Sequence, residues 1–263
     1  MAFVSRCFML MMALLAPFAM GASGPDQITL VSSTETKESM YGRWLELIYR
    51  DAFTRLGYRF TYLGYPGGRA PYLAARGEVD GEIHRPAIYQ SQTQALLRVP
   101  ESHFPLSYEV YTALPNIRLS GWQSLQPTSY RVEYRRGAKL PEIELGKVVS
   151  GERLSTIGTV AQGMNKLLKG RSDIYVEQSM IARQALQHLV VHSVDYQRIY
   201  SAGVMITADS FVYLHRRHQS MLGPLAAVLK QMKQEGVIER YRKLALQESG
   251  TTTLAPPSAP TSP

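Results

Sequence analysis

Cysteine is almost absent from this sequence, because Cys7 is the only one in 263 residues. It lies in an N-terminal segment with the pattern of a secretory signal: Arg6, an apolar run from Cys7 to Met20, and small residues from Gly21 to Ser23. The run is shorter than the roughly 20 residues of a membrane-spanning helix, and Pro17 interrupts it. We therefore expect residues 1–22 to be a signal peptide that is cleaved on export.

Without this segment the exported chain has no thiol, which excludes disulfides, thiolate metal sites and cysteine nucleophiles. The sequence also lacks a Gly-x-Ser-x-Gly elbow, a His-Glu-x-x-His motif and a phosphate loop. Two histidine pairs have helical spacing, His188 with His192 and His215 with His218, but no carboxylate accompanies them as a third ligand. We predict no catalytic residue, no metal and no cofactor.

Acidic residues are outnumbered by basic ones, and the formal net charge is +8. Such a balance is compatible with nucleic acid, an anionic envelope surface or small anionic solutes as partners. Export argues against nucleic acid, and the basic residues are scattered along the chain. The densest group is Arg131, Arg135, Arg136 and Lys139, which we interpret mostly as a solvated surface.

The first part of the chain has the pattern of a β-α-β unit. Residues 28–32 form a compact apolar strand, and residues 60–63 form a second one. Between them, Ser39 is placed to cap a helix that ends at Gly57. Its apolar residues recur every four positions at Trp44, Ile48, Ala52 and Leu56. The sheet is therefore expected to be at least partly parallel.

The stretch from Gly77 to Tyr89 is interpreted as an inner strand that ends in one cation, Arg85, just before Pro86. In open α/β sheets, ligands bind in the crevice beyond the carboxyl ends of the strands, where a guanidinium can hold a carboxylate with two parallel bonds. Arg85 is therefore the first candidate for ligand contact. The alternative is that Arg85 only pairs with Glu82 or Asp80 on a solvated rim.

From Gly121 the pattern of the first half begins again. Strands are expected at 130–134 and 173–176, a short apolar piece at 148–149 and a helix at 159–169. Further elements are a helix at 181–191, a returning strand at 211–215 and C-terminal helices around Gly236. We therefore expect two lobes. The first comprises residues 26–110 and 207–247, and the second comprises residues 111–206. Residues 248–263 are expected to be a disordered tail.

The order of these elements, the GEVDGE strand, the GRSD strand entry and the closing stretch FVYLHRRHQSMLGPLAAVLKQMKQEGVIERYRK resemble the family 3 bacterial extracellular solute-binding proteins. The resemblance covers nearly all of residues 26–246. It implies the α/β, two-lobed type II periplasmic-binding-protein fold, in which each lobe is a mixed sheet flanked by helices and the ligand cleft lies between the lobes. It also implies a periplasmic monomer that passes a small solute, most commonly an amino acid, to a membrane transporter permease or presents it to a receptor.

The sequence departs from this family where its members usually hold the ligand carboxylate. Residues 92–94 stand where the family's arginine would fall, so the clamp is absent or has moved to Arg85. The family aspartate that holds the ligand amine corresponds to Glu177 or Gln178. We add Tyr41 and Tyr89 as aromatic platforms and Glu35 as a weaker loop candidate, while Trp44 is interpreted as core.

Two other functions are compatible with the same cleft. Glu177 with Arg85 could imitate cyclohexadienyl dehydratase, an enzyme of this fold, and turnover of prephenate or arogenate would identify it. A sensory module would use the cleft to report to a signalling partner, and a pull-down from membranes would distinguish that partner from a permease. The predicted function is capture of a small carboxylate-bearing solute.

Overall fold

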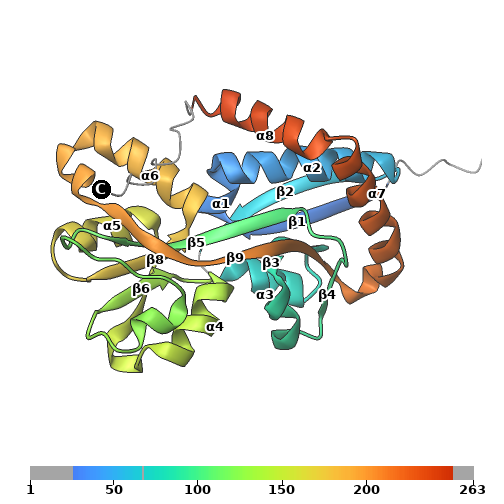
Figure 1. Ribbon diagram of the computed structural model, residues 1–263. Helices are drawn as coiled ribbons and strands as arrows, with labels where there is room; N and C mark the ends of the chain where they lie inside the picture. Colours follow the sequence, from blue (N-terminus) through green and yellow to red (C-terminus); the bar gives the residue numbers. More distant parts are fainter. Residues whose placement is uncertain (1–25, 67, 251–263) are drawn as a thin grey trace, which may run out of the picture.

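The computed structural model describes residues 26–66 and 68–250, and Figure 1 shows their arrangement. The expected signal peptide and residues 251–263 of the expected tail lie outside the described residues. Within the two described ranges, no helix has both the length and the apolar composition needed to cross a membrane.

Nine strands form one curled sheet in the order β2-β1-β3-β9-β5-β8-β6-β7, with β4 paired to β9. Their bounds are β1 (Gln27–Ser33), β2 (Arg59–Tyr65), β3 (Gly81–Pro86), β4 (Leu96–Arg98), β5 (Phe104–Thr112), β6 (Val132–Arg135), β7 (Leu154–Ile157), β8 (Ile174–Gln178) and β9 (Tyr200–His215).

The sheet has a parallel group at each end and an antiparallel middle. β1 pairs in parallel with β2 and β3, and β6 pairs in parallel with β7 and β8. The long strands β5 and β9 pair with each other in antiparallel orientation and run from one group to the other. We call β1–β3 and their helices the first lobe, and β6–β8 and theirs the second lobe.

Within the described residues, eight α-helices cover the sheet. Their bounds are α1 (Thr34–Glu38), α2 (Met40–Arg55), α3 (Arg69–Ala75), α4 (Lys139–Val148), α5 (Val160–Leu168), α6 (Ser179–His192), α7 (Leu222–Gln234) and α8 (Val237–Glu248). Helices α2, α7 and α8 belong to the first lobe, and α4, α5 and α6 to the second (Figure 1). The α-helices of the described chain thus lie around both ends of the sheet.

Helix α2 begins as predicted, because the side chain of Ser39 accepts a hydrogen bond from the Gly42 N–H. Trp44 lies in the core as interpreted. Its ring stacks on Phe104 with 3.5 Å between the centroids, and its Nε1 donates to the Ile238 carbonyl of α8 at 2.8 Å. One aromatic side chain therefore joins α2, β5 and α8.

The second half of the chain differs from the prediction in three places. The apolar piece expected at 148–149 is the end of α4. This helix was not predicted, because it contains Pro141 and Gly146, which are typical of turns and loops. β7 was not expected, because only Ile157 of its four residues is buried. β9 starts at Tyr200 rather than at 211, because only Ala202 and Met205 are buried in residues 200–209, so this part lacks the period-two pattern of a strand and also contains Gly203. The predicted lobe boundaries fall inside β5 and β9 and stay a prediction.

Substitution of Gly81 tests the close approach of β3 to β9. A Cβ at this position would lie 2.1 Å from the Tyr213 carbonyl oxygen, which is backbone and cannot rotate away. We expect Gly81→Ala to lower the free energy of unfolding by about 1–3 kcal/mol. Gly146→Ala on α4, where a Cβ meets nothing within 4 Å, should instead raise it by about 0.5–1 kcal/mol. Chemical denaturation measures both, and equal behaviour of the two variants would contradict the expectation.

The buried His103 predicts a pH dependence of stability. Its Nδ1 lies 2.9 Å from the Tyr49 hydroxyl, and burial followed by the nearby Lys233 lowers its pKa from 6.5 to about 3. The unfolded chain then binds more protons than the folded chain between these values, so stability falls as the pH drops from about 6.5 to 3. The slope from this residue is at most about 1.4 kcal/mol per pH unit.

His103→Asn should remove this part of the slope, whereas Tyr49→Phe, which keeps the imidazole, should retain it. Denaturation curves recorded between pH 7 and 4 compare the two variants. If His103→Asn and the parent protein show the same slope, burial of the neutral imidazole is not the cause.

Candidate functional site

A small hollow, with an enclosed volume of about 30 Å³, lies between the two lobes. The first lobe contributes Ser32, Ser33 and Arg85 to its wall, and the second contributes Arg135 and Gln178. These residues stand at or just beyond the carboxyl ends of parallel strands, as ligand-contacting groups do in open α/β sheets. The hollow is the candidate site.

Arg85 lines this hollow but is already paired within the chain. Its Nε donates to Glu82 Oε1 at 2.9 Å, its Nη2 donates to the same oxygen, and its Nη1 donates to the Gly137 carbonyl of the second lobe at 2.9 Å. The pair with Glu82 that we gave as the alternative is therefore present. It is not on a solvated rim, because Arg85 is only 8% exposed and Glu82 only 1%.

The two predicted tyrosine platforms lie behind the wall of the hollow. Tyr41 is fully buried on α2 and packs edge-on against His84 and Phe104. Tyr89 packs against Arg85, with 5.1 Å between its ring centroid and the guanidinium carbon. Neither ring is part of the lining, so both position residues that are.

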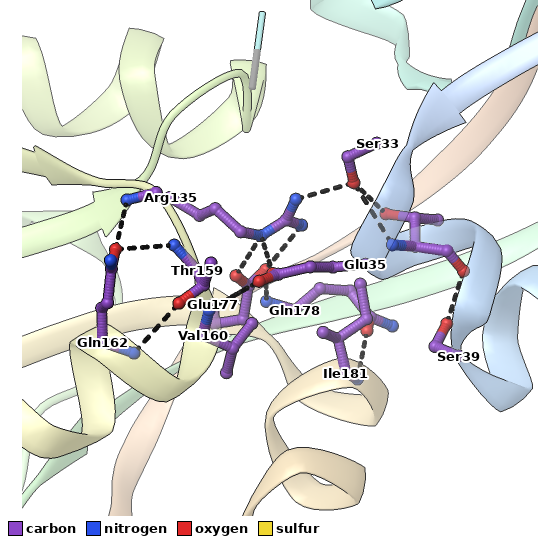
Figure 2. Close-up of polar contacts among 12 residues, drawn as sticks. Ser33, Glu35, Ser39, Arg135, Thr159, Val160, Gln162, Glu177, Gln178 and Ile181 are labelled. Carbon is purple, nitrogen blue, oxygen red and sulfur yellow. Dashed lines mark hydrogen bonds and ion pairs between the residues drawn. The ribbon is translucent and has the colours of Figure 1, made fainter. Parts of the chain in front are cut away.

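Glu177 is buried beside Arg135, a residue that we had interpreted as surface. Arg135 Nε donates to Glu177 Oε2 at 2.8 Å (Figure 2). The Tyr175 hydroxyl donates to the same oxygen at 2.7 Å. All four residues of β6 are buried, since it is a central strand between β7 and β8. The expectation of a solvated Arg135 is therefore wrong, because a charge on such a strand must be paired inside the protein.

Gln178 and Glu82 each leave one polar atom in the wall without a partner. Gln178 Oε1 accepts from the Ile181 N–H at 2.8 Å and caps α6, while its Nε2 has no hydrogen-bond partner among the described residues. Glu82 Oε2 also has no partner that meets the geometry of a hydrogen bond among the described residues, although the Tyr89 hydroxyl interacts with the Glu82 carboxylate. Both residues are at most 2% exposed. Buried polar atoms are normally hydrogen-bonded, so this donor and this acceptor are available to a bound molecule.

His84 is a lining residue that the sequence analysis missed. It lies between Glu82 and Arg85 on β3, where no motif marks it. Burial, followed by the charges of Arg85, His103 and Arg135, lowers its pKa well below 6.5. The imidazole is therefore neutral at physiological pH and offers one donor and one acceptor.

Glu35 reaches across from the first lobe to the second. Its carboxylate accepts from the Val160 N–H at 3.0 and 3.2 Å and lies 3.3 Å from Arg135 Nε. Burial raises the pKa of Glu35, although Arg135 and the Val160 N–H act in the opposite direction. The predicted weak loop candidate is therefore a half-buried residue on the short helix α1, and its carboxylate contacts the second lobe (Figure 2).

The chemistry of the hollow is that of a polar binding site. Its wall combines three arginines and a lysine, of which Arg85 and Arg135 are buried and paired with carboxylates, with a neutral imidazole, hydroxyl groups, and one donor and one acceptor that lack a partner among the described residues. No three His, Cys, Asp or Glu side chains come together to hold a metal ion in the part of the chain that the structure describes.

Removal of Arg135 should be strongly destabilising, because Glu177 would stay buried without its counter-charge. We expect Arg135→Ala to lower the free energy of unfolding by about 3–5 kcal/mol in chemical denaturation. Arg242→Ala is the matched control, since Arg242 pairs with Glu239 on the exposed face of α8 and should lose less than about 1 kcal/mol. Similar losses for both variants would show that Arg135 does not stabilise the second lobe through Glu177.

Comparison with solved structures confirms the two-lobed fold. A histidine kinase sensor domain with similarity to periplasmic binding proteins has 12% identity and a TM-score of 0.67 over 85% of this chain and 97% of its own. An ancestral arginine-binding protein bound to arginine has 11% identity and a TM-score of 0.65 over 84% and 99%. The amino acid ABC transporter substrate-binding protein AbpA from Streptococcus pneumoniae, bound to L-arginine, has 11% and 0.65 over 86% and 96%.

At these identities the likeness establishes the fold alone, which is the α/β fold of periplasmic binding proteins that we predicted. No family model matches the chain. A protein of Shewanella oneidensis that is described as uncharacterized is 35% identical over 230 residues, which are 88% of this chain and 86% of the relative. The chain therefore belongs to the same family as this Shewanella oneidensis protein.

Proposed function

We propose that this protein is a periplasmic solute-binding protein that captures a small carboxylate-bearing solute, an amino acid or a related molecule, in the hollow between its lobes. The observation that carries the proposal is the pair of unpartnered polar atoms, Glu82 Oε2 and Gln178 Nε2, buried in the wall of that hollow. The likeness to amino-acid-binding proteins of the same fold supports it.

Arg85 is the proposed receiver of the solute's carboxylate. A guanidinium has five N–H donors, and Glu82 and Gly137 take three of those of Arg85. The remaining donors and Gln178 Nε2 supply hydrogen bonds to a carboxylate, while Glu82 Oε2 accepts from an ammonium or hydroxyl group. In this proposal Glu177 holds Arg135 in place rather than touching the solute.

The energies of these contacts are sufficient for capture of a solute. A hydrogen bond to a charged group contributes about 1.5–3 kcal/mol, and micromolar binding requires about 8 kcal/mol. Three or four such bonds reach that range once the lobes enclose the solute. Because the solute contacts both lobes only when they are together, it stabilises the closed arrangement, and a membrane partner can recognise that arrangement.

Two membrane partners are compatible with this mechanism. Delivery to a transporter permease is the role we propose first, in line with the resemblance of the sequence to family 3 solute-binding proteins. A sensory role is the second candidate, and the likeness to a histidine kinase sensor domain favours it. Cross-linking to membrane proteins followed by mass spectrometry distinguishes the two roles, because it identifies the cross-linked partner as either a permease or a receptor kinase.

A thermal-shift screen against amino acids, small carboxylates and peptides tests the proposal. A solute at 100 times its dissociation constant should stabilise the folded protein by about 2.7 kcal/mol. Arg85→Lys keeps the charge that neutralises Glu82 but removes the planar fork, so it should weaken carboxylate binding roughly tenfold, or about 1.4 kcal/mol.

Arg76→Lys is the control for that variant, because Arg76 pairs with Glu78 on the exposed surface of the first lobe. It should bind like the parent protein in isothermal titration. A screen in which no solute shifts the unfolding temperature would count against solute capture, and equal affinity in Arg85→Lys would remove Arg85 from the site.

A further inference from the structure

The two lobes are joined across the hollow by the chain's own polar groups. Arg135 of the second lobe donates through Nη1 to the Ser33 hydroxyl of the first at 2.8 Å, and Arg85 of the first donates to the Gly137 carbonyl of the second. Glu35 contributes the contacts to Val160 and Arg135 that Figure 2 shows. Glu35 is therefore the one carboxylate in this group that belongs to one lobe and has its partners in the other.

The cap of helix α5 shows why a carboxylate fits this place. Thr159 and Gln162 form a capping box, in which each side chain accepts from the backbone N–H of the other. This box leaves the N–H of Val160, the first residue of α5, without a partner from its own helix. Both carboxylate oxygens of Glu35 take that N–H, so the first lobe completes the cap of a second-lobe helix.

Two electrostatic effects favour the carboxylate at this position. The N-terminus of an α-helix carries partial positive charge, and α5 is nine residues long. Arg135, whose side chain is only 7% exposed, stands beside it and is shared between Glu35 and Glu177. The charged groups that face Glu35 are thus Arg135 of β6, Glu177 of β8 and Glu38 of its own helix.

We propose that Glu35 is a built-in latch that holds the two lobes together through Val160 and Arg135, so that the closed arrangement is populated before a solute binds. The latch lowers the free energy that the solute must supply for closure, since apparent affinity scales with the fraction of molecules already in the binding-competent state. As a device for solute capture it rests on the proposed function. As a contact between lobes it is tested without any solute.

Small-angle X-ray scattering of the protein with no solute added is the test. Glu35→Ala should increase the radius of gyration relative to the parent protein. Glu38→Ala is the matched control, because it removes the same charge from the same helix at an exposed position with no ion pair in the described structure. The scattering curve of Glu38→Ala should superimpose on that of the parent.

A second variant removes the same contact by a change in the second lobe. Val160→Pro removes the N–H that Glu35 accepts, and proline is well tolerated at the first position of a helix. The extended backbone of Thr159, with φ −132° and ψ 155°, also suits a residue before proline. We expect this variant to expand as Glu35→Ala does, while far-UV circular dichroism shows that both stay folded.

Scattering curves of Glu35→Ala and Val160→Pro that superimpose on the parent curve would overturn the latch. That result would leave solute capture intact, because no solute is present. Conversely, a thermal-shift screen without a hit would reject solute capture and leave the expansion of the two variants unaffected. The two proposals therefore fail separately.

Discussion

The buried guanidinium of Arg135 is the interaction on which the interlobe region depends. A cation inside the protein is tolerated only with its charge balanced and its donors satisfied, and here Glu177, Glu35 and Ser33 share that task. Glu177 lies in the same lobe, whereas Glu35 and Ser33 come from the other. The same charge that β6 must neutralise therefore also brings the lobes into contact, which links the fold of the second lobe to the geometry of the hollow.

The parts of the fold that local chemistry determines could be predicted from the sequence. The β-α-β start, the Ser39 cap and the stop at Gly57 depend on residues a few positions apart, and all agree with the structure. The position of Arg85 at the end of an inner strand is of the same kind. Helix α4 could not be predicted in this way, because packing of Leu140 and Leu145 into the second-lobe core outweighs the weak local preference of a segment with proline and glycine.

The partners of the charged residues could not be predicted, since they depend on strand order. Arg135 and Glu177 are 42 positions apart and meet only because β6 and β8 are neighbours. Glu35 and Val160 are 125 positions apart. For the same reason the choice between Glu177 and Gln178 stayed open in the sequence: successive residues of a strand point to opposite sides, and only the structure places Gln178 in the lining.

The distribution of charge in the hollow bears on the solute binding that we propose. Arg85, Arg135 and Lys139 of the wall are each paired with a carboxylate of the chain, whereas Arg136, which also lines the hollow, is exposed. The buried part of the wall therefore holds its cations as ion pairs, since an unpaired charge in a buried place is costly. Because the unpartnered atom of Glu82 belongs to the same ion pair as the remaining donors of Arg85, the solute that we propose would meet an acceptor and donors at one position.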